Sequence, residues 1–351
     1  MKPWMIYGAY GYTGALIAEV AVQRGHTPVL AGRSEEKLRP LAERYHLPYR
    51  VLSLDDADAL ETALGEVDAV CHAAGPYVHT ASPMVTACLK TGTHYLDITG
   101  EIAVFEQHFA LDEAARKAGI TLLSGVGFDV VPSDCLAARV AAQMPDATHL
   151  ELAFTALSST SAGTAKSMLE GLPRGSVRRV DGKLVPATLG RPTRRVRFDD
   201  RERLVAAIPW GDLSTAYRTT GIPNITTYMA YPRQMIRWMP LLSTLGGGLL
   251  RLSTLRRALQ RWAEANIHGP DEHTRKTGRT HLWAEARNTA GERIEARLQT
   301  IEPYQFTAEA AVRAVEAVLN GDAPTGTQTP ALAFGADFVL QVPGCAFIDH
   351  R

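Results

Sequence analysis

The stretch "MIYGAYGYTGALIAE", residues 5–19, decides the fold of this chain. Three glycines spaced three residues apart, Gly8, Gly11 and Gly14, lie between a short apolar run and a helical pattern. Gly8 allows a tight turn out of the strand, Gly11 lets the backbone approach a phosphate, and Gly14 lets the helix pack close to the sheet. The helix N-terminus adds N–H groups and a favourable dipole for a pyrophosphate. The first gap is one residue longer than in G-x-G-x-x-G, so the interpretation depends on the strand before and the helix after.

The surrounding residues 1–132 alternate apolar strands with helical patterns and short joints. The expected further strands are PVLAG (28–32), YRVLSL (49–54), DAVCHAA (68–74), HYLDI (94–98) and ITLLS (120–124). A helix is expected to start at Ser82-Pro83, because Pro is well tolerated in the first turn, and to end at Gly92. Strands that are apolar throughout and joined by helices indicate a parallel sheet covered on both faces. We predict an α/β, doubly wound parallel (Rossmann) domain that binds a dinucleotide.

The pattern changes in residues 133–304, where candidate strands follow one another after only a few residues. Such short connections favour an antiparallel or mixed sheet, so we predict a second, α+β domain for substrate binding and dimerisation. The C-terminal segment 305–351 opens with a helical pattern at Thr307–Asn320. We expect this segment to complete the first domain.

Composition excludes several classes of protein. Hydrophobic residues make up 46% and charged residues 21%, which is typical of a soluble globular protein. The 37 basic and 37 acidic residues balance, which argues against a nucleic-acid partner. The four cysteines form no CxxC pair, so we expect neither a disulfide framework nor a metal site, and a reducing, cytoplasmic setting is the simpler one. We find no signal-peptide pattern and no apolar stretch long enough to span a bilayer.

The end of the second strand predicts which dinucleotide binds. An NAD site usually has an acidic residue there, on the ribose 2′-hydroxyl. This chain has "AGRS", so Arg33 and Ser34 take that place. A guanidinium fork matches a 2′-phosphate, and a serine hydroxyl adds a hydrogen bond. We therefore predict NADP (NADPH) as the cofactor; the alternative is a surface arginine beside a helix-capping serine.

Two loops at the predicted carboxyl edge carry candidate catalytic residues. Strand four ends in "AAGPYVHT", where Ala74, Gly75 and Pro76 turn the chain beside the cofactor site. Tyr77 and His79 follow and could face the nicotinamide or the substrate; a plain turn is the alternative.

Strand five ends in "HYLDITGE". Asp97 and Glu101 in this loop could orient the substrate, hold the next loop or relay a proton. A helix cap with loop hydrogen bonds is the structural alternative. In the loop after strand six, "GVGFDVVPSD", Gly125 and Gly127 permit close backbone approach and Asp129 lies beside them.

The segment 233–265 is apolar and basic, and is broken by Pro240 and three glycines at 246–248. One interpretation is a helical hairpin packed on the second sheet. The alternatives are a lid over an apolar substrate, a dimerisation face, or a surface that makes peripheral contact with a membrane.

The motifs "GAYGYTG", "LAGRS", "AAGPY", "GTHYLDITGE" and "GFDVVPSD", in this order and spacing, resemble the saccharopine dehydrogenase-like family. They are most similar to its branch of trans-acting enoyl reductases. The resemblance covers residues 1 to about 140 and implies a Rossmann domain, a second α/β domain with the substrate cleft between the two, and a homodimer.

The resemblance also implies roles for individual residues. Those matching the pyrophosphate loop are Gly8, Tyr10, Gly11, Tyr12, Thr13 and Gly14. Arg33 and Ser34 match the 2′-phosphate contact, and Gly75, Pro76 and Tyr77 match the segment near the nicotinamide ribose. The family's motif after strand five is matched by Tyr95, Asp97, Gly100 and Glu101.

Three functions follow as hypotheses. The first is an NADPH-dependent oxidoreductase that reduces an apolar, unsaturated, enoyl-type small molecule, with Tyr77, Tyr95 or His79 returning the proton. The second is a saccharopine-type dehydrogenase acting on the C–N bond of an amino-acid conjugate. The carboxylates of such a substrate would be bound by arginines. The candidates are Arg174, Arg178, Arg194, Arg195 and Arg197. The third is a non-enzymatic NADP-sensing protein.

Overall fold

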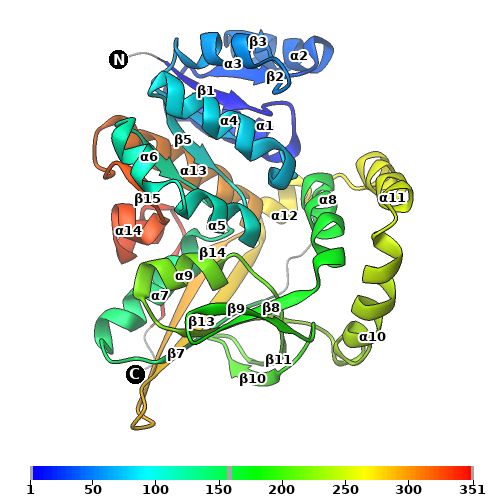
Figure 1. Cartoon of the computed structure of the whole chain (residues 1–351), viewed down its shortest axis with the longest axis vertical. Helices are drawn as coiled ribbons and strands as arrows, with labels where there is room; N and C mark the ends of the chain where they lie inside the picture. The colour runs from blue at the N-terminus through cyan, green and yellow to red at the C-terminus, as the bar shows by residue number, and fades with distance from the viewer. Residues whose placement is uncertain (1–2, 156–159, 349–351) are drawn as a thin grey trace. The chain divides into compact units, whose positions relative to one another are not determined.

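The computed structural model of the chain describes residues 3–155 and 160–348, apart from the side chains of residues 174, 242 and 244–247. It divides into two units (Figure 1). The first unit comprises residues 1–129 and 304–334, and the second comprises 130–303 and 335–351. The sequence predicts that all of segment 305–351 completes the first unit. The structure gives its last part to the second, where residues 346–347 pair with a strand of the second sheet.

The first unit is built on one parallel sheet of seven strands. Its strands are β1 (Trp4–Tyr7), β2 (Val29–Gly32), β3 (Tyr49–Val51), β4 (Ala69–His72), β5 (His94–Asp97), β6 (Thr121–Leu123) and β15 (Gly326–Gln328). Their order is β15-β6-β5-β4-β1-β2-β3, and every neighbouring pair is parallel. This confirms the predicted doubly wound sheet. The chain reverses its direction across the sheet between β1 and β4, which is where such folds bind ligands.

Helices connect these strands (Figure 1). They are α1 (Tyr12–Gln23), α2 (Glu35–Tyr45), α3 (Ala57–Leu64), α4 (Tyr77–Thr91), α5 (Ile102–Phe109), α6 (Asp112–Lys117), α13 (Pro303–Leu319) and α14 (Pro330–Phe334). The central strands are buried along their whole length, because helices cover both faces of the sheet. The predicted start of α4 at Ser82-Pro83 is wrong: the helix begins at Tyr77 and Pro83 lies inside it.

The second unit contains a mixed sheet of nine strands. They are β7 (His149–Phe154), β8 (Ser176–Val180), β9 (Lys183–Ala187), β10 (Thr193–Arg197), β11 (Glu202–Ala207), β12 (Asn224–Ala230), β13 (Arg279–Arg287), β14 (Arg293–Ile301) and β16 (Ala346–Phe347). Strands β7 and β12 are parallel, and the other described pairs are antiparallel. The prediction of an α+β unit on a mixed or antiparallel sheet is therefore confirmed.

The helices of the second unit are α7 (Val131–Gln143), α8 (Ala162–Gly171), η1 (Leu172–Arg174), α9 (Asp212–Thr220), α10 (Arg233–Leu250), α11 (Ser253–Asn266), α12 (Glu272–Thr277) and η2 (Ala336–Gln341). Helices α10 and α11 form the apolar and basic segment noted in the sequence. Among the described residues, none of the helices has the length and hydropathy that crossing a membrane requires.

Candidate cofactor site

The glycine loop after β1 has the close packing that a phosphate cradle needs. Gly8 has φ +83°, and a Cβ there would lie 2.8 Å from the Ala74 Cβ. A Cβ on Gly14 would lie only 2.3 Å from the carbonyl oxygen of Gly8. Gly11 is the N-cap of α1 and supplies no side chain to cap the helix. The N–H groups of the first turn of α1 therefore receive no side-chain cap from Gly11, and this arrangement fits a pyrophosphate.

The end of β2 forms a second, cationic part of the site. The Tyr10 ring lies over Gly32, where a Cβ would be 2.6 Å from the ring Cε1. The Lys37 Nζ lies 5.7 Å from the centroid of the same ring. Arg33 is exposed, and its side chain makes no hydrogen bond or ion pair with any residue that the structure describes. Two cations thus flank the place where a 2′-phosphate is predicted.

Ser34 has the alternative role that its sequence position suggested. Its Oγ accepts a hydrogen bond of 3.4 Å from the Lys37 N–H, so Ser34 is the N-cap of α2. The hydroxyl proton remains able to donate to a phosphate oxygen. The sequence did not indicate Lys37 as a candidate, because it lies one helical turn after the AGRS motif. Only the folded structure shows that its ammonium lies near the Tyr10 ring.

The remaining predicted loop residues lie in the first turn of α1 and before α4. The Tyr12 ring packs edge-on against Tyr304 of α13, with ring centroids 5.1 Å apart. Thr13 is half-buried in the first turn. Ala74 is held in place by Thr80, whose Oγ1 donates a hydrogen bond of 2.7 Å to its carbonyl oxygen. Gly75 is exposed and Pro76 is the N-cap of α4, so this loop presents backbone beside the cradle.

Glu101 joins the loop after β5 to the start of α4. Its Oε1 accepts a hydrogen bond of 2.8 Å from the Tyr77 N–H, and its Oε2 accepts one of 3.0 Å from the Val78 N–H. The carboxylate therefore caps the positive end of a helix that starts 24 residues earlier in the sequence. This contact explains why α4 begins at Tyr77 and not at Ser82.

We expect Glu101→Gln to lower the free energy of unfolding by about 1–2 kcal/mol, because the variant loses a charge-assisted helix cap. NADPH affinity should change by less than about threefold, since a neutral amide still accepts one of the two N–H bonds. Urea unfolding and NADPH titration measure the two effects. The control is Glu113→Gln, on exposed α6. Unchanged stability together with a large loss of activity would give Glu101 the catalytic role instead.

Asp97 is the centre of a buried hydrogen-bond network. Its Oδ1 accepts bonds from the Thr99 N–H (3.1 Å) and the Gly125 N–H (2.9 Å). Its Oδ2 accepts bonds from the hydroxyls of Tyr95 (2.9 Å) and Ser124 (3.1 Å). Burial raises the pKa of the Asp97 carboxyl to about 6, although the four hydrogen bonds act to lower it. Asp97 thus ties the loops after β5 and β6 together.

The two candidate tyrosines lie inside the first unit. Tyr95 is fully buried, and its hydroxyl is engaged by Asp97. The Tyr77 hydroxyl donates a bond of 3.1 Å to the carbonyl oxygen of His72. Burial raises the pKa of both hydroxyls well above the ordinary value. His79 is exposed in the first turn of α4. Of the three suggested proton donors, only His79 is exposed. The catalytic roles of all three stay predictions.

Asp129 is a carboxyl group with unusual surroundings at the end of the β6 loop. It is half-buried, and burial raises the pKa of its carboxyl to about 7. A Cβ on Gly100 would lie 2.6 Å from Asp129 Oδ2, and one on Gly125 would lie 3.1 Å from the Asp129 carbonyl oxygen. The carboxyl accepts no hydrogen bond from the described part of the chain. Such a perturbed group at the ligand-binding edge is typical of functional sites. The sequence placed Asp129 in the loop but gave no sign of this environment.

One cluster in the second unit has the residue types of a metal site. Ligand atoms of Asp199, Asp200 and His281 lie within 4.8 Å of one another. However, Arg203 donates bonds of 2.5 and 2.6 Å to the two oxygens of Asp200 and holds the pKa of that carboxyl down, at about 2. Asp199 Oδ1 lies 2.5 Å from His281 Nδ1. Both carboxylates of the cluster thus already have partners within the chain, and the expectation of no metal stays a prediction.

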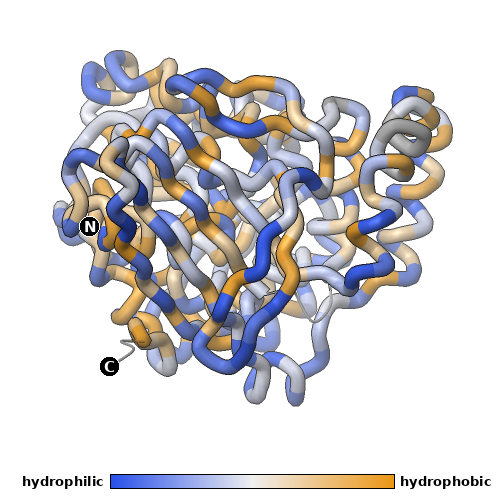
Figure 2. The backbone as a smooth tube through the Cα atoms, turned by 90° about the horizontal axis from the view of Figure 1, so that it is seen from below, coloured by the Kyte–Doolittle hydropathy of each residue, from blue (hydrophilic) through white to orange (hydrophobic). Residues whose placement is uncertain are grey.

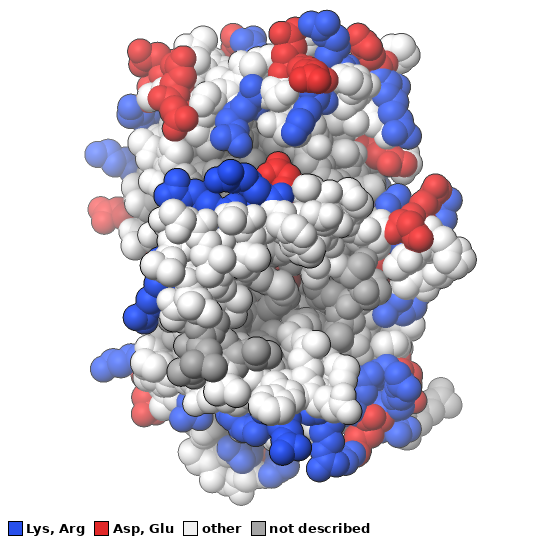
Figure 3. Space-filling view, turned by 90° about the vertical axis from the view of Figure 1, so that its right-hand side faces the viewer, with Lys and Arg blue, Asp and Glu red and all other residues white. Residues whose placement is uncertain are grey.

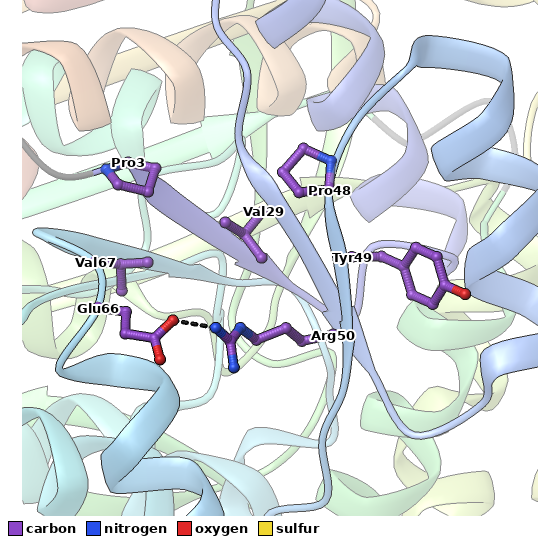
Figure 4. A pocket seen from close by; sticks show the side chains of 7 residues that line it. All are labelled: Pro3, Val29, Pro48, Tyr49, Arg50, Glu66 and Val67. Carbon is purple, nitrogen blue, oxygen red and sulfur yellow. Dashed lines mark hydrogen bonds and ion pairs between the residues drawn. The ribbon is translucent and has the colours of Figure 1, made fainter.

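A hollow in the first unit lies at the opposite edge of the sheet (Figure 4). Its lining comes from the amino ends of β1, β2 and β3 and from the residues before β4. Arg50 and Glu66 form an exposed ion pair across it. Ligands of doubly wound sheets bind at the carboxyl ends of the strands, so this hollow is not the cofactor site.

The fold and this edge define an NADP-binding Rossmann domain of the class found in NAD(P)-dependent oxidoreductases. A family model, the saccharopine dehydrogenase NADP binding domain, matches residues 4–123. Residues 4–123 of this chain therefore belong to that domain family, which confirms the predicted cofactor and the predicted resemblance.

Relatives of known name share the first part of the chain. A trans-acting enoyl reductase of Mycobacterium leprae is 36% identical over 140 residues, which are 37% of this chain and 33% of that protein. One of Mycobacterium ulcerans is 33% identical over 140 residues, with the same coverage. The matched part of this chain thus spans 33% of the length of each of these two relatives.

Among solved structures, a saccharopine dehydrogenase (L-Glu forming) of Saccharomyces cerevisiae has a TM-score of 0.67 at 13% identity. The match covers 99% of this chain and 100% of that one. At this identity the likeness concerns the fold, and it extends the agreement to the elements of both units.

Proposed function

We propose that the protein is an NADPH-dependent reductase of an apolar, unsaturated, enoyl-type small molecule. The observation that carries the proposal is the cofactor edge of the first unit. A glycine cradle, the cations Arg33 and Lys37 and a carboxyl of raised pKa occur there on the segments that follow β1, β2 and β6. The names of the relatives that share this part of the chain support the enoyl substrate.

Each part of the edge has a distinct task. The first turn of α1 would hold the pyrophosphate, while Arg33 and Lys37 would hold the 2′-phosphate. NADPH, when bound, supplies a hydride to the substrate. Asp129 would supply the proton, because a carboxyl with a pKa of about 7 is about half protonated at neutral pH and accepts no hydrogen bond from the described residues. Asp97 keeps the loops after β5 and β6 in place, and Asp129 lies in the second of them.

Two of the candidate arginines, Arg194 and Arg195, are poorly suited to a saccharopine-type substrate. Arg194 is paired with Glu151 and, at 2.6 Å, with Glu285. Arg195 pairs with Glu202 at 2.8 Å, on an exposed strand. These guanidinium groups are neutralised by the protein's own carboxylates and would not bind a polycarboxylate tightly. Arg178 and Arg197 are exposed, and the side chain of Arg174 lies outside the described part.

The test is NADPH oxidation by the purified full chain against a panel of enoyl, imine and ketone substrates. Turnover of enoyl substrates supports the proposal, and turnover of imines alone would favour the saccharopine-type alternative. Tight NADPH binding without turnover of any class would overturn both and favour the NADP-sensing protein. A strong preference for long apolar enoyl chains over short ones would support the apolar character of the substrate.

We expect Asp129→Asn to lower the enoyl-dependent rate by about 10²–10⁴-fold, with NADPH affinity unchanged. In the wild type the rate should fall as pH rises through about 7, because Asp129 then loses its proton. The variant should lack this pH dependence. The pH–rate profile measures both.

A stability readout accompanies this test. The folded pKa of Asp129 is about 7 against an ordinary 3.8, so the folded state holds the proton more tightly. The free energy of unfolding of the wild type should therefore fall as pH rises between about 4 and 7, and less so in the variant. Asp322→Asn, at an exposed loop position, is the control. An unaltered pH–rate profile in Asp129→Asn would remove Asp129 from the proton transfer.

A further inference from the structure

Helices α10 and α11 form a hairpin with buried residues in both helices. Ile236 and Met239 of α10 are buried, and a Cβ on Gly190 would lie 3.0 Å from the Met239 Cβ. From α11, Arg256 Nε donates a bond of 3.2 Å to Glu170 of α8, and Ala263 is buried. The hairpin thus packs on the loop before β10 and on α8.

The solvent-exposed surface of the hairpin carries large apolar side chains. They are Met235 (50% exposed), Trp238 (54%), Leu241 (48%), Leu249 (59%), Leu252 (59%), Leu255 (38%) and Trp262 (60%). Leu255 and Trp262 are seven residues apart, so they lie on the same side of α11. Met235, Trp238 and Leu241 follow one another at steps of three along α10. An exposed apolar patch of this kind marks an interaction surface.

The charge of the hairpin is predominantly basic. Residues 233–266 contain six arginines and one acidic residue, Glu264, whose carboxylate pairs with Lys166 of α8 at 2.7 Å. The arginines are Arg233, Arg237, Arg251, Arg256, Arg257 and Arg261. All of them except Arg256 are exposed. Figure 2 shows hydrophobic and hydrophilic residues along this hairpin at the right of the view. Figure 3 shows an uncharged area whose upper and lower borders are mostly Lys and Arg, with a few acidic residues among them.

We propose that this face, named here the α10–α11 face, docks on the surface of an anionic lipid membrane. Apolar side chains that include two tryptophans, set among six arginines and one acidic residue that is paired with Lys166, fit the boundary between acyl chains and anionic headgroups. The hairpin lies along such a surface and does not cross it, in keeping with the absence of a spanning helix among the described residues. A second copy of the chain fits less well, because two like faces would oppose arginine to arginine.

The experiment measures co-sedimentation of the full chain with vesicles of phosphatidylcholine alone and of phosphatidylcholine mixed with phosphatidylserine. We expect at least about tenfold stronger partition onto the anionic vesicles, reduced by high salt. A double variant, Trp238→Gln with Trp262→Gln, and a second one, Arg257→Glu with Arg261→Glu, should each lose about tenfold or more. Matched controls are Leu340→Gln (41% exposed) and Arg178→Glu, which lie elsewhere on the second unit and should bind as the wild type does.

Tryptophan fluorescence provides an independent readout of the same contact. Trp4 and Trp283 are buried and Trp210 is half-buried, so Trp238 and Trp262 are the ones open to lipid. Their emission should shift to shorter wavelength on anionic vesicles and be quenched by brominated lipid. NADPH affinity and the thermal midpoint should be unchanged in the surface variants, which separates this proposal from that of the cofactor site.

Two results would overturn the proposal. One is binding that is absent, or that is equal on both kinds of vesicle and unaffected by the four substitutions. The other is a wild-type dimer in sedimentation analysis without lipid that the Trp238→Gln and Trp262→Gln variant dissociates, because the face would then be covered by a second copy. In that case it would be the interface of the homodimer that the family resemblance implies.

Discussion

Gly14→Ala is expected to abolish measurable NADPH binding and to lower the free energy of unfolding by about 2–4 kcal/mol. The new Cβ would lie 2.3 Å from the carbonyl oxygen of Gly8 and 3.0 Å from the Cα of Ala9. Both neighbours are backbone atoms, so α1 must move away from β1 or the loop must open. Either movement changes the direction of the N–H groups that face the phosphates. Isothermal titration with NADPH and urea unfolding measure the two effects.

The matched control is Gly65→Ala in the same unit. Gly65 has φ −62°, and its nearest added contact, at 3.4 Å from the Glu61 carbonyl oxygen, is ordinary packing. This variant should keep NADPH affinity and gain up to about 1 kcal/mol of stability, because alanine restricts the unfolded chain. Unchanged NADPH affinity in Gly14→Ala would remove the phosphate cradle from this loop. Gly11→Val is the complementary case: its Cβ meets Gly8 O at 3.2 Å, so the fold should survive while the side chain fills the phosphate space.

Arg33→Asp is expected to weaken NADPH binding by about 100-fold while it changes NADH binding by less than about threefold. Arg33 is exposed and unpaired within the described part of the chain, so its charge is available to a 2′-phosphate and replacing it places a carboxylate there. NADH has a ribose hydroxyl at that position, which neither attracts nor repels the new carboxylate strongly. Parallel titrations of both cofactors give the ratio.

Two further variants sharpen this test. Lys37→Ala should weaken NADPH binding by about 5–10-fold, because its ammonium is close to Tyr10 and less directly placed. Arg44→Asp changes the same charge in the last turn of α2, away from the site, and should affect neither cofactor. Equal losses for NADPH and NADH in Arg33→Asp would assign the 2′-phosphate to other residues.

The roles of the local motifs of the first unit could be predicted from the sequence, because each motif is a continuous strand, turn and helix. Gly8, Gly11 and Gly14 lie within seven residues, so their roles follow from backbone geometry that neighbouring residues decide. The same holds for Arg33, which follows its strand directly. The parallel order of β1 to β6 could also be predicted, since alternating apolar strands and helices admit few other folds. The oligomeric state and the cytoplasmic setting stay predictions.

The tertiary structure alone decided which polar side chains are open to a ligand. Tyr95, Asp97 and Glu101 lie within seven residues of one another in the sequence, yet the first two are buried and the third caps a helix that starts 24 residues earlier. Asp129 differs from them because Gly100 and Gly125 pack against it while no donor reaches its carboxyl. Hydrogen bonds and desolvation between distant segments set these states, and no local pattern records them. Sequence by itself thus determined the cofactor domain and the glycine cradle, and the fold selected the groups that can act on a substrate.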